Sequence, residues 1–519
     1  MSPGTGRSTA ADDGAGDRLP ARHELTARAA IDLLSAGSLT AAELVDACLA
    51  RIERIDPKVN AMVTVAADRA RSEAAAIDGD RSAGRPVGPL AGLPVAIKDL
   101  QATAGIRTTL GAEALADHVP TVDAGIVARV RSAGGIVIGK TNIPERSIGA
   151  NTVNRLFGAT GNPFDPSRTS GGSSGGSAVA LATRMAPLAT GSDHGGSLRI
   201  PACYCGVVGF RATPGVVPFE ERTTAQTYYS VQGPMARTVD DLALLLSVIT
   251  ERDPAATAMT GPKTRDPMAY PLDAGVFATL DDIDPATLRI GVSEDLGGVL
   301  VSGPVRAAFR DRVERLASRV AVCEDVTIDL RAATEVDWRL RSDVFVTQYH
   351  REAQDWDAGF NPNVRATYDA AITTPMEVIA RARRAQMELI QAVQSLTDRY
   401  DVILCPGVSV SPFPWRQLYP TEVDGAPVDN YMAWLTLTAA ITVIGHPVVA
   451  LPAGRDDAGL PFGIQVIGRA HDDRRLLSAA RSIEAVFAAD PVTARPVPDD
   501  ASLLASTVDL ADVTAVFAD

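Results

Sequence analysis

Two stretches rich in glycine and serine stand out in this chain: Thr169-Ser-Gly-Gly-Ser-Ser-Gly-Gly-Ser-Ala178 and Gly191-Ser-Asp-His-Gly-Gly-Ser-Leu-Arg-Ile-Pro201. Because glycine has no Cβ, such stretches let the backbone adopt positive φ and bring N–H groups close to an oxyanion or a phosphate. Both run into predicted helices, whose N-termini favour negative charge. A mixed apolar helix and strand predicted over 179–190 argues against flexible linkers. The two stretches therefore predict an anion-stabilising active site.

A phosphate loop and a nucleophile elbow are the rival interpretations of these stretches. A phosphate loop ends in Gly-Lys-Ser/Thr, which neither stretch contains. Gly171-Gly-Ser-Ser-Gly175 formally matches the G-x-S-x-G elbow of α/β-hydrolases, which use a Ser-His-Asp triad. The elbow follows an apolar strand, however, whereas the segment 162–170 contains two prolines and is predicted to be a turn-forming loop. Neither rival fits its surroundings.

Outward from these stretches, short apolar segments alternate with amphipathic helices. A capping-box pair, Thr40 and Glu43, begins an early helix that we expect to end at Pro57. The alternation predicts an α/β fold with a large mixed β-sheet core flanked by helices on both faces. The predicted strands lie near 93–97, 136–138, 288–292, 402–404 and 447–451, and predicted helices lie near 126–130 and 305–316.

Length allows either one large domain or two, since the chain has 519 residues. Residues 1–22 are rich in Gly, Asp, Ser and Ala without the apolar core of a signal peptide, which predicts a disordered tail. Residues 214–284 and 328–440 are loop-rich or helical, and we expect them to cover the substrate. Residues 501–519 are expected to form a C-terminal tail.

The net charge and the cysteine content limit which partners, metal sites and cellular location are expected. A net charge of −14 without a basic run argues against nucleic acid and anionic membranes. The uncharged stretch 435–454 contains threonines, a histidine and prolines, so it predicts a buried helix and strand rather than a membrane span. The five cysteines lack CxxC spacing, which indicates neither a disulfide framework nor a zinc site. We expect a cytoplasmic protein with no metal or cofactor.

A catalytic serine needs a base, and the lysines and histidines are the candidates. His194 precedes Ser197 by three residues, and the other five histidines show no relation to acidic partners. Lys98 ends the apolar strand Gly92-Leu-Pro-Val-Ala-Ile-Lys98. Burial there would lower its pKa, as a general base requires. A solvated lysine at a strand end remains the alternative when Lys98 is considered alone.

Taken together, these segments resemble the amidase signature family. The resemblance rests on Lys98, on the Gly-Gly-Ser173-Ser-Gly-Gly stretch, and on Ser197 in Gly-Ser-Asp-His-Gly-Gly-Ser-Leu-Arg-Ile-Pro-Ala, 24 residues later. Further matches are Gly139-Lys-Thr-Asn142, Gly233-Pro-Met-Ala-Arg-Thr-Val239 and Gly463-Ile-Gln-Val-Ile-Gly468. The resemblance covers residues 24–490 and implies a single amidase signature domain over residues 23–500.

The resemblance implies a role for each of these residues. Ser197 would be the nucleophile that forms the acyl-enzyme, Ser173 a bridging serine held by a cis peptide, and Lys98 the neutral base reached through Ser173. The backbone N–H groups of His194, Gly195, Gly196 and Ser197 would form the oxyanion hole. His194 departs from the family, in which this position is commonly small or apolar.

Two functions share this signature and both remain open. One is a stand-alone amidase, which could also cleave esters, anilides, carbamates or urethanes. The other is the glutaminase component of an amidotransferase, which works with partner subunits on aminoacyl-tRNA. Such components usually carry glutamine after the signature Arg199, and Ile200 here favours the stand-alone enzyme.

We expect a small-molecule amide substrate with an apolar or aromatic group, and a homodimer is allowed. Gly172 is a candidate substrate-binding residue. Candidate aromatic walls of the substrate pocket are Tyr228, Tyr229, Phe345, Tyr349, Tyr431 and Trp434, each of which could instead be a core residue.

Overall fold

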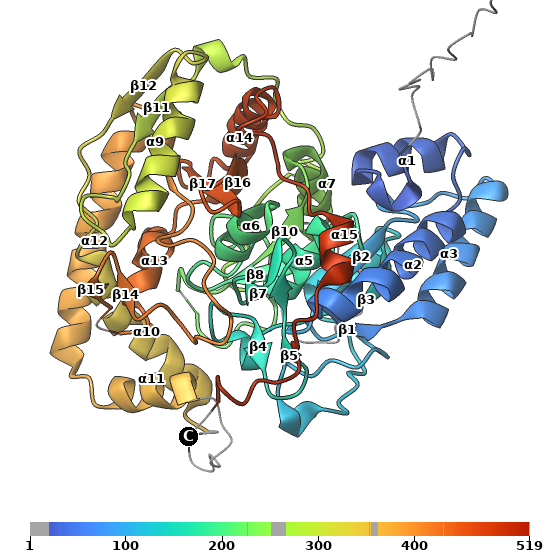
Figure 1. Ribbon diagram of the computed structural model, residues 1–519, viewed down its shortest axis with the longest axis horizontal. Helices are drawn as coiled ribbons and strands as arrows, with labels where there is room; N and C mark the ends of the chain where they lie inside the picture. Colours follow the sequence, from blue (N-terminus) through green and yellow to red (C-terminus); the bar gives the residue numbers. More distant parts are fainter. Residues whose placement is uncertain are drawn as a thin grey trace, which may run out of the picture.

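A mixed β-sheet of 11 strands runs through the molecule (Figure 1). The computed structural model describes residues 20–225, 227–250, 266–273, 275–351, 353, 362–428 and 430–517. In sheet order the strands are β1 (Met62–Val65), β3 (Ile136–Thr141), β2 (Pro94–Lys98), β8 (Leu188–Asp193), β10 (Val231–Ala236), β9 (Val208–Arg211), β16 (Val448–Arg455), β17 (Pro461–Ile467), β13 (Val402–Pro406), β11 (Arg289–Val292) and β12 (Val322–Asp325).

The strand directions are mixed. β2 is parallel to β3 and β8, and β11 is parallel to β12 and β13. The other neighbouring pairs are antiparallel. Three short hairpins lie outside this sheet: β4 (Val153–Asn154) with β5 (Gly158–Ala159), β6 (Gly161–Asn162) with β7 (Asp165–Thr169), and β14 (Glu422–Val423) with β15 (Ala426–Pro427).

Helices flank the sheet on both faces, which confirms the predicted fold class. They are α1 (Ala27–Ser35), α2 (Ala41–Val59), α3 (Ala67–Ser82), α4 (Gly125–Ser132), α5 (Gly175–Ala182), α6 (Arg199–Cys205), α7 (Val239–Ile249), α9 (Gly303–Ala317), α10 (Ala333–Tyr349), α11 (Pro362–Ile372), α12 (Met376–Thr397), α13 (Thr436–Ile444), α14 (Asp473–Ala488) and α15 (Asp500–Ala505). α5 and α6 pack together against central strands, and α7 contacts both α4 and α14. In Figure 1, α10, α11 and α12 lie at the opposite side from α1, α2 and α3.

The predicted strands and helices are present. Thr40 and Glu43 form the predicted capping box at the start of α2, with Thr40 Oγ1 accepting from the Glu43 N–H at 3.1 Å. The prediction that Pro57 ends this helix is wrong. Pro57 lies inside the last turn. The helix ends at Val59, and Asn60, with its left-handed backbone, is the C-cap. The uncharged stretch at 435–454 is the predicted buried helix and strand, α13 and β16.

Two predictions about loops need correction. The segment predicted as a loop before Ser170 is largely the hairpin of β6 and β7, which lies outside the large sheet. The segment at 214–284, expected to cover the substrate, contains β10, a central strand that pairs with β8 and β9. Gly233 and Pro234 concealed this strand, because a Gly-Pro pair is typical of turns and proline is rare in central strands.

The two predicted tails lie at the ends of the chain. The predicted disordered tail, residues 1–22, lies outside the described residues except for its last three, of which Arg22 begins a short 3₁₀ turn. The predicted C-terminal tail contains the end of α15 and then packs on the body of the protein. Leu510 is buried against Val153, Ala159 and Trp415.

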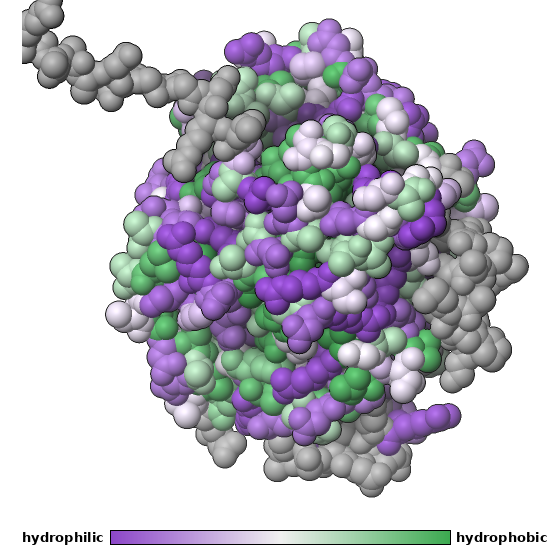
Figure 2. All heavy atoms as spheres, turned by 90° about the vertical axis from the view of Figure 1, so that its right-hand side faces the viewer, coloured by the Kyte–Doolittle hydropathy of each residue, from purple (hydrophilic) through white to green (hydrophobic). Residues whose placement is uncertain are grey.

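The surface is mixed in character. On the face shown in Figure 2, hydrophilic side chains are interspersed with apolar ones. Within the described ranges, no helix is both long and apolar enough to cross a membrane.

Candidate active site

The direction of two neighbouring strands brings the predicted site residues together. β2 ends at Lys98 and the parallel strand β8 ends at Asp193, so both strands end at the same edge of the sheet. The Lys98 N–H donates to Thr190 Oγ1 at 3.2 Å, which joins the two strands near this edge. The glycine-rich stretch containing Ser197 continues directly from β8.

Lys98 is buried among serine hydroxyls. Its side chain is 0% exposed, which excludes the alternative of a solvated lysine. Nζ donates to Ser173 Oγ at 2.7 Å and to Ser192 Oγ at 2.8 Å. Burial lowers the pKa of Lys98 to about 7, although the nearby charge of Asp193 opposes this shift. A substantial fraction of Lys98 is therefore neutral near pH 7 and able to accept a proton.

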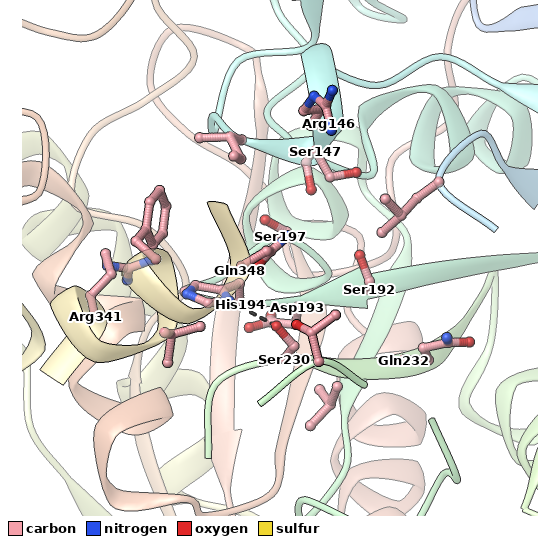
Figure 3. A pocket seen from close by; sticks show the side chains of 18 of the residues that line it. Arg146, Ser147, Ser192, Asp193, His194, Ser197, Ser230, Gln232, Arg341 and Gln348 are labelled. Carbon is pink, nitrogen blue, oxygen red and sulfur yellow. Dashed lines mark hydrogen bonds between the residues drawn. The ribbon is translucent and has the colours of Figure 1, made fainter. Parts of the chain in front are cut away.

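The two glycine-rich stretches are in direct contact. The Ser174 N–H donates to the carbonyl of Ser197 at 3.2 Å, and the peptide between Gly172 and Ser173 is cis. Gly171 has φ of +75°, and a Cβ there would lie 3.0 Å from Pro201, so glycine is required on both grounds. Ser173, Ser192 and Ser197 all line one cavity, and Lys98 Nζ donates to the hydroxyls of the first two. Figure 3 shows Ser192 and Ser197 in this cavity.

A buried ionic cluster fixes the loop that carries Ser197. Arg199 donates to both carboxylate oxygens of Asp193 at 3.0 Å, and Arg211 donates to Oδ1 at 3.1 Å. Burial would raise the pKa of Asp193, but the two guanidinium groups hold it well below its usual range. All three side chains are fully buried. Two cations beside one carboxylate leave an excess positive charge beneath this loop.

The carboxylate of Asp193 also accepts a hydrogen bond from one of the four backbone N–H groups predicted for the oxyanion hole. The Gly196 N–H donates to Asp193 Oδ1 at 2.9 Å, and the Leu198 N–H donates to Oδ2 at 3.2 Å. The Gly196 N–H therefore points to Asp193, which differs from its predicted place in the oxyanion hole. Its φ of +130° shapes the loop, and a Cβ there would lie 2.5 Å from Thr438 Oγ1. His194, Gly195 and Ser197 line the cavity.

The cavity has a volume of about 340 Å³. One face of α10 forms a wall, through residues at helical spacing: Arg341, Val344, Phe345, Gln348 and Tyr349. Phe345, Tyr349 and Tyr431 thus lie where aromatic walls were expected.

The other four candidate substrate-binding residues do not line the cavity. Tyr229 is buried behind His194, and its hydroxyl donates to the Asp337 carbonyl at 3.2 Å. Tyr228 packs on Gly445 instead. Trp434 packs edge-on against Phe413, and Gly172 lies against the backbone of 149–151. The cause is local geometry: Thr227 and Ser230 face the cavity, and the two tyrosines between them do not.

Ser192 is a site residue that the sequence reasoning did not single out. It is adjacent to Asp193 in the second glycine-rich stretch, and its position at the end of β8 was the available signal. Lys140 offers a contrast. It is also fully buried, and burial lowers its pKa to about 7, yet it donates to Thr103 Oγ1 at 2.7 Å and does not line the cavity.

Clusters of three or more His, Cys, Asp or Glu side chains that could hold a metal ion are absent from the part of the chain that the structure describes. The polar groups at the site are hydroxyls, amides, the amine of Lys98, the imidazole of His194 and charged side chains.

Comparison with known proteins places these features in a family. The sequence matches the Amidase family over residues 43–477. It is 32% identical to one of the subunits of the glutamyl-tRNA(Gln) amidotransferase of Alkaliphilus metalliredigens, over 86% of this chain and 93% of the relative. It is 31% identical to an acylamidase of Rhodococcus erythropolis, over 89% of this chain and 96% of the relative.

Solved structures agree with the sequence relatives. A bacterial aryl acylamidase of the amidase signature enzymes superposes with a TM-score of 0.80 at 27% identity, over 89% of this chain and 96% of the other. The family match spans most of the chain, and the lysine and serines that carry the signature lie together at one edge of the sheet. The chain therefore belongs to the amidase signature family of enzymes that hydrolyse carbon–nitrogen bonds.

Proposed function

We propose that this enzyme hydrolyses carboxylic amides through an acyl-enzyme on Ser197, with Ser173 and Lys98 as a proton relay. The observation that carries the proposal is the hydrogen bond of 2.7 Å between Lys98 Nζ and Ser173 Oγ, at the wall of the cavity that also contains Ser197. A serine hydroxyl needs a base to become nucleophilic, and a buried neutral lysine supplies one.

The relay moves one proton in each direction in acylation, and again in deacylation. As Ser197 Oγ attacks the amide carbon, its proton passes to Ser173 Oγ, and the proton of Ser173 passes to Lys98 Nζ. The return of a proton along the same path to the amide nitrogen lets the C–N bond break and the amine leave. Water then attacks the acyl-enzyme by the same relay and releases the carboxylate.

The negative charge that develops on the carbonyl oxygen needs donors. We propose the backbone N–H groups of His194, Gly195 and Ser197, without that of Gly196, which is directed at Asp193. Each preorganised donor contributes about 3 kcal/mol to the transition state. The excess positive charge of Arg199 and Arg211 over Asp193 beneath the loop adds to this stabilisation.

The walls of the cavity favour an apolar or aromatic substrate group. Val344 and Phe345 of α10 line the cavity together with Ile148 and Leu435. Side chains of this kind bind by removal of apolar surface from water rather than by specific hydrogen bonds. Esters, anilides and carbamates pass through the same tetrahedral oxyanion, so the proposed chemistry extends to them.

The glutaminase component of an amidotransferase is the second candidate function, because one relative at 32% identity belongs to the glutamyl-tRNA(Gln) amidotransferase. A glutaminase of that kind would depend on partner subunits. The stand-alone amidase is favoured by Ile200, which lines the cavity at the position where such glutaminases usually carry glutamine.

One experiment separates the two. The purified chain is assayed against a panel of amides, anilides, carbamates and glutamine, together with Ser197→Ala and a serine-directed phosphonate. We expect unaided hydrolysis of an apolar amide, covalent labelling at Ser197, and loss of several orders of magnitude in Ser197→Ala. Labelling at Ser174 or Ser177 would contradict the assignment. Glutamine hydrolysis that appears only with added partner subunits would establish the second candidate.

A further inference from the structure

The side chain of His194 occupies the wall of the cavity without a role in the proposed relay. Its ring stacks on Tyr229 with centroids 4.9 Å apart, and Nδ1 is 2.9 Å from Ser230 Oγ. Nε2 is buried and has no hydrogen-bond partner within the described residues. A buried polar atom without a partner is destabilising, and at a cavity wall it marks a place where a ligand supplies the partner.

Arg341 presents a second polar atom at the same place. Its Nε and Nη2 donate to the carboxylate of Asp337, with the shortest contact at 2.9 Å. No described residue accepts from Nη1. The guanidinium lies over Tyr229, 5.2 Å from the ring centroid, and a Cβ on Gly195 would lie 3.0 Å from Nη2. His194 and Arg341 therefore both line the cavity beside the loop that carries Ser197 (Figure 3).

The hydrogen-bonding properties of His194 Nε2 and Arg341 Nη1 determine which kind of ligand group could bind them. A guanidinium can only donate. Its positive charge acts on His194 and favours the tautomer that donates from Nδ1 to Ser230 Oγ and leaves a lone pair on Nε2. Burial and the charge of Arg341 lower the pKa of His194 well below its usual value, so the imidazole is neutral. Nε2 is then an acceptor and Nη1 a donor, on two side chains that both line the cavity.

We propose that His194 Nε2 and Arg341 Nη1 form a polar subsite that binds a hydroxyl group carried by the substrate close to its scissile amide. The hydroxyl oxygen accepts from Nη1, and its proton is donated to Nε2. Asp337 compensates the charge of Arg341, so the subsite calls for an uncharged group rather than a carboxylate. The inference rests on the proposed amide hydrolysis and deepens it by naming a substrate class: hydroxyamides with an apolar or aromatic body.

The test compares matched substrates in matched variants. The pairs are mandelamide with phenylacetamide and 3-hydroxy-3-phenylpropanamide with 3-phenylpropanamide. We expect kcat/KM of the wild type to favour at least one hydroxyamide about 10- to 100-fold, as buried polar groups left unpaired penalise the deoxy analogue. His194→Phe keeps a ring to stack on Tyr229 and removes both nitrogens, so the preference should fall to about one. Tyr228→Phe, outside the cavity, should retain it.

Three results would overturn the subsite: no preference for either hydroxyamide, an unchanged preference in His194→Phe, or a methoxy analogue that is as good as the hydroxyl. A direct readout of the tautomer accompanies the kinetics. In protein with ¹⁵N-labelled histidine, the resonances lost in His194→Phe should show a protonated Nδ1 and an unprotonated Nε2, and the opposite tautomer contradicts the acceptor role.

Binding to Ser197→Ala separates this inference from the proposed function. Dissociation constants of the same amide pairs are measured calorimetrically with that variant and with Ser197→Ala/His194→Phe. A hydroxyl preference in binding that His194→Phe abolishes supports the subsite even if the wild type hydrolyses none of these amides, a result that would count against the proposed function alone. Hydrolysis without any such preference refutes the subsite alone.

Discussion

Placing a carboxylate beside Lys98 should shift the pH dependence of the enzyme in a defined direction. Ser192 Oγ lies 2.8 Å from Lys98 Nζ, so the change Ser192→Asp brings a negative charge next to the ammonium form. Two opposite unit charges about 4 Å apart attract by about 4 kcal/mol at an effective dielectric constant of about 20, equivalent to about 3 pKa units at most. Desolvation of the new carboxylate reduces the net increase in the pKa of Lys98 to about 1–2 units.

The consequence for activity follows from the neutral fraction of Lys98. With a pKa of about 7, roughly half of Lys98 is neutral at pH 7. An increase of about 1–2 units leaves roughly 9% to 1% neutral, which predicts a loss of about 5- to 50-fold in kcat/KM at pH 7. At pH 9 the loss should shrink to about twofold or less, because most of the lysine is again neutral. Activity should therefore recover as the pH rises.

The assay is kcat/KM between about pH 5.5 and 9.5 on an amide identified by the substrate panel, with circular dichroism as the check on folding. Ser192→Asn is the matched control, since it is similar in size and carries no charge. An ascending limb that stays at the same pH in Ser192→Asp would refute Lys98 as the titrating base. An equal shift in Ser192→Asn would show that packing, not charge, moves the limb.

Three further outcomes are expected. Lys98→Arg should lose activity by several orders of magnitude, because a guanidinium stays protonated. Ser173→Ala should also lose activity severely, because alanine breaks the proposed relay. Retention of activity in either variant would contradict the mechanism. Asp193→Asn should destabilise the fold by about 3–5 kcal/mol in denaturant titration, since two buried arginines lose their counter-charge, and an unchanged midpoint would contradict this. Truncation after residue 506 should lower the melting temperature, because Leu510 no longer covers Trp415; an unchanged melting temperature would show that this contact is dispensable.

Sequence reasoning named the residues that local motifs and the family resemblance mark. Lys98 ends an apolar strand and Ser173 lies in a glycine-rich stretch, and the resemblance to the amidase signature family named both; in the structure a hydrogen bond joins their side chains. The parallel pairing of β2 and β8 brings Lys98 beside Ser192 and the loop that carries Ser197. Sequence reasoning failed where tertiary contacts decide. Tyr229 faces away from the cavity because its hydroxyl finds the Asp337 carbonyl, 108 residues away in the chain.

The predicted donor at Gly196 illustrates the same limit. Its place in the motif is visible in the sequence, but the orientation of its N–H is set by the carboxylate of Asp193, itself fixed by Arg211 from another strand. Likewise, β10 was hidden by Gly233 and Pro234, and only its pairing with β8 shows that it is a strand.

The wall formed by α10 has a consequence for how the enzyme can change. The residues of the proposed relay and the loop that carries Ser197 come from residues 98–197, at one edge of the sheet, whereas Val344 and Phe345 come from one helix far along the chain. Mutations on that helix can therefore alter which substrate is accepted while the reacting groups stay in place. Divergence within the family has a direct route here: a library randomised at the cavity-facing positions of α10 should yield new selectivities from an unaltered catalytic apparatus.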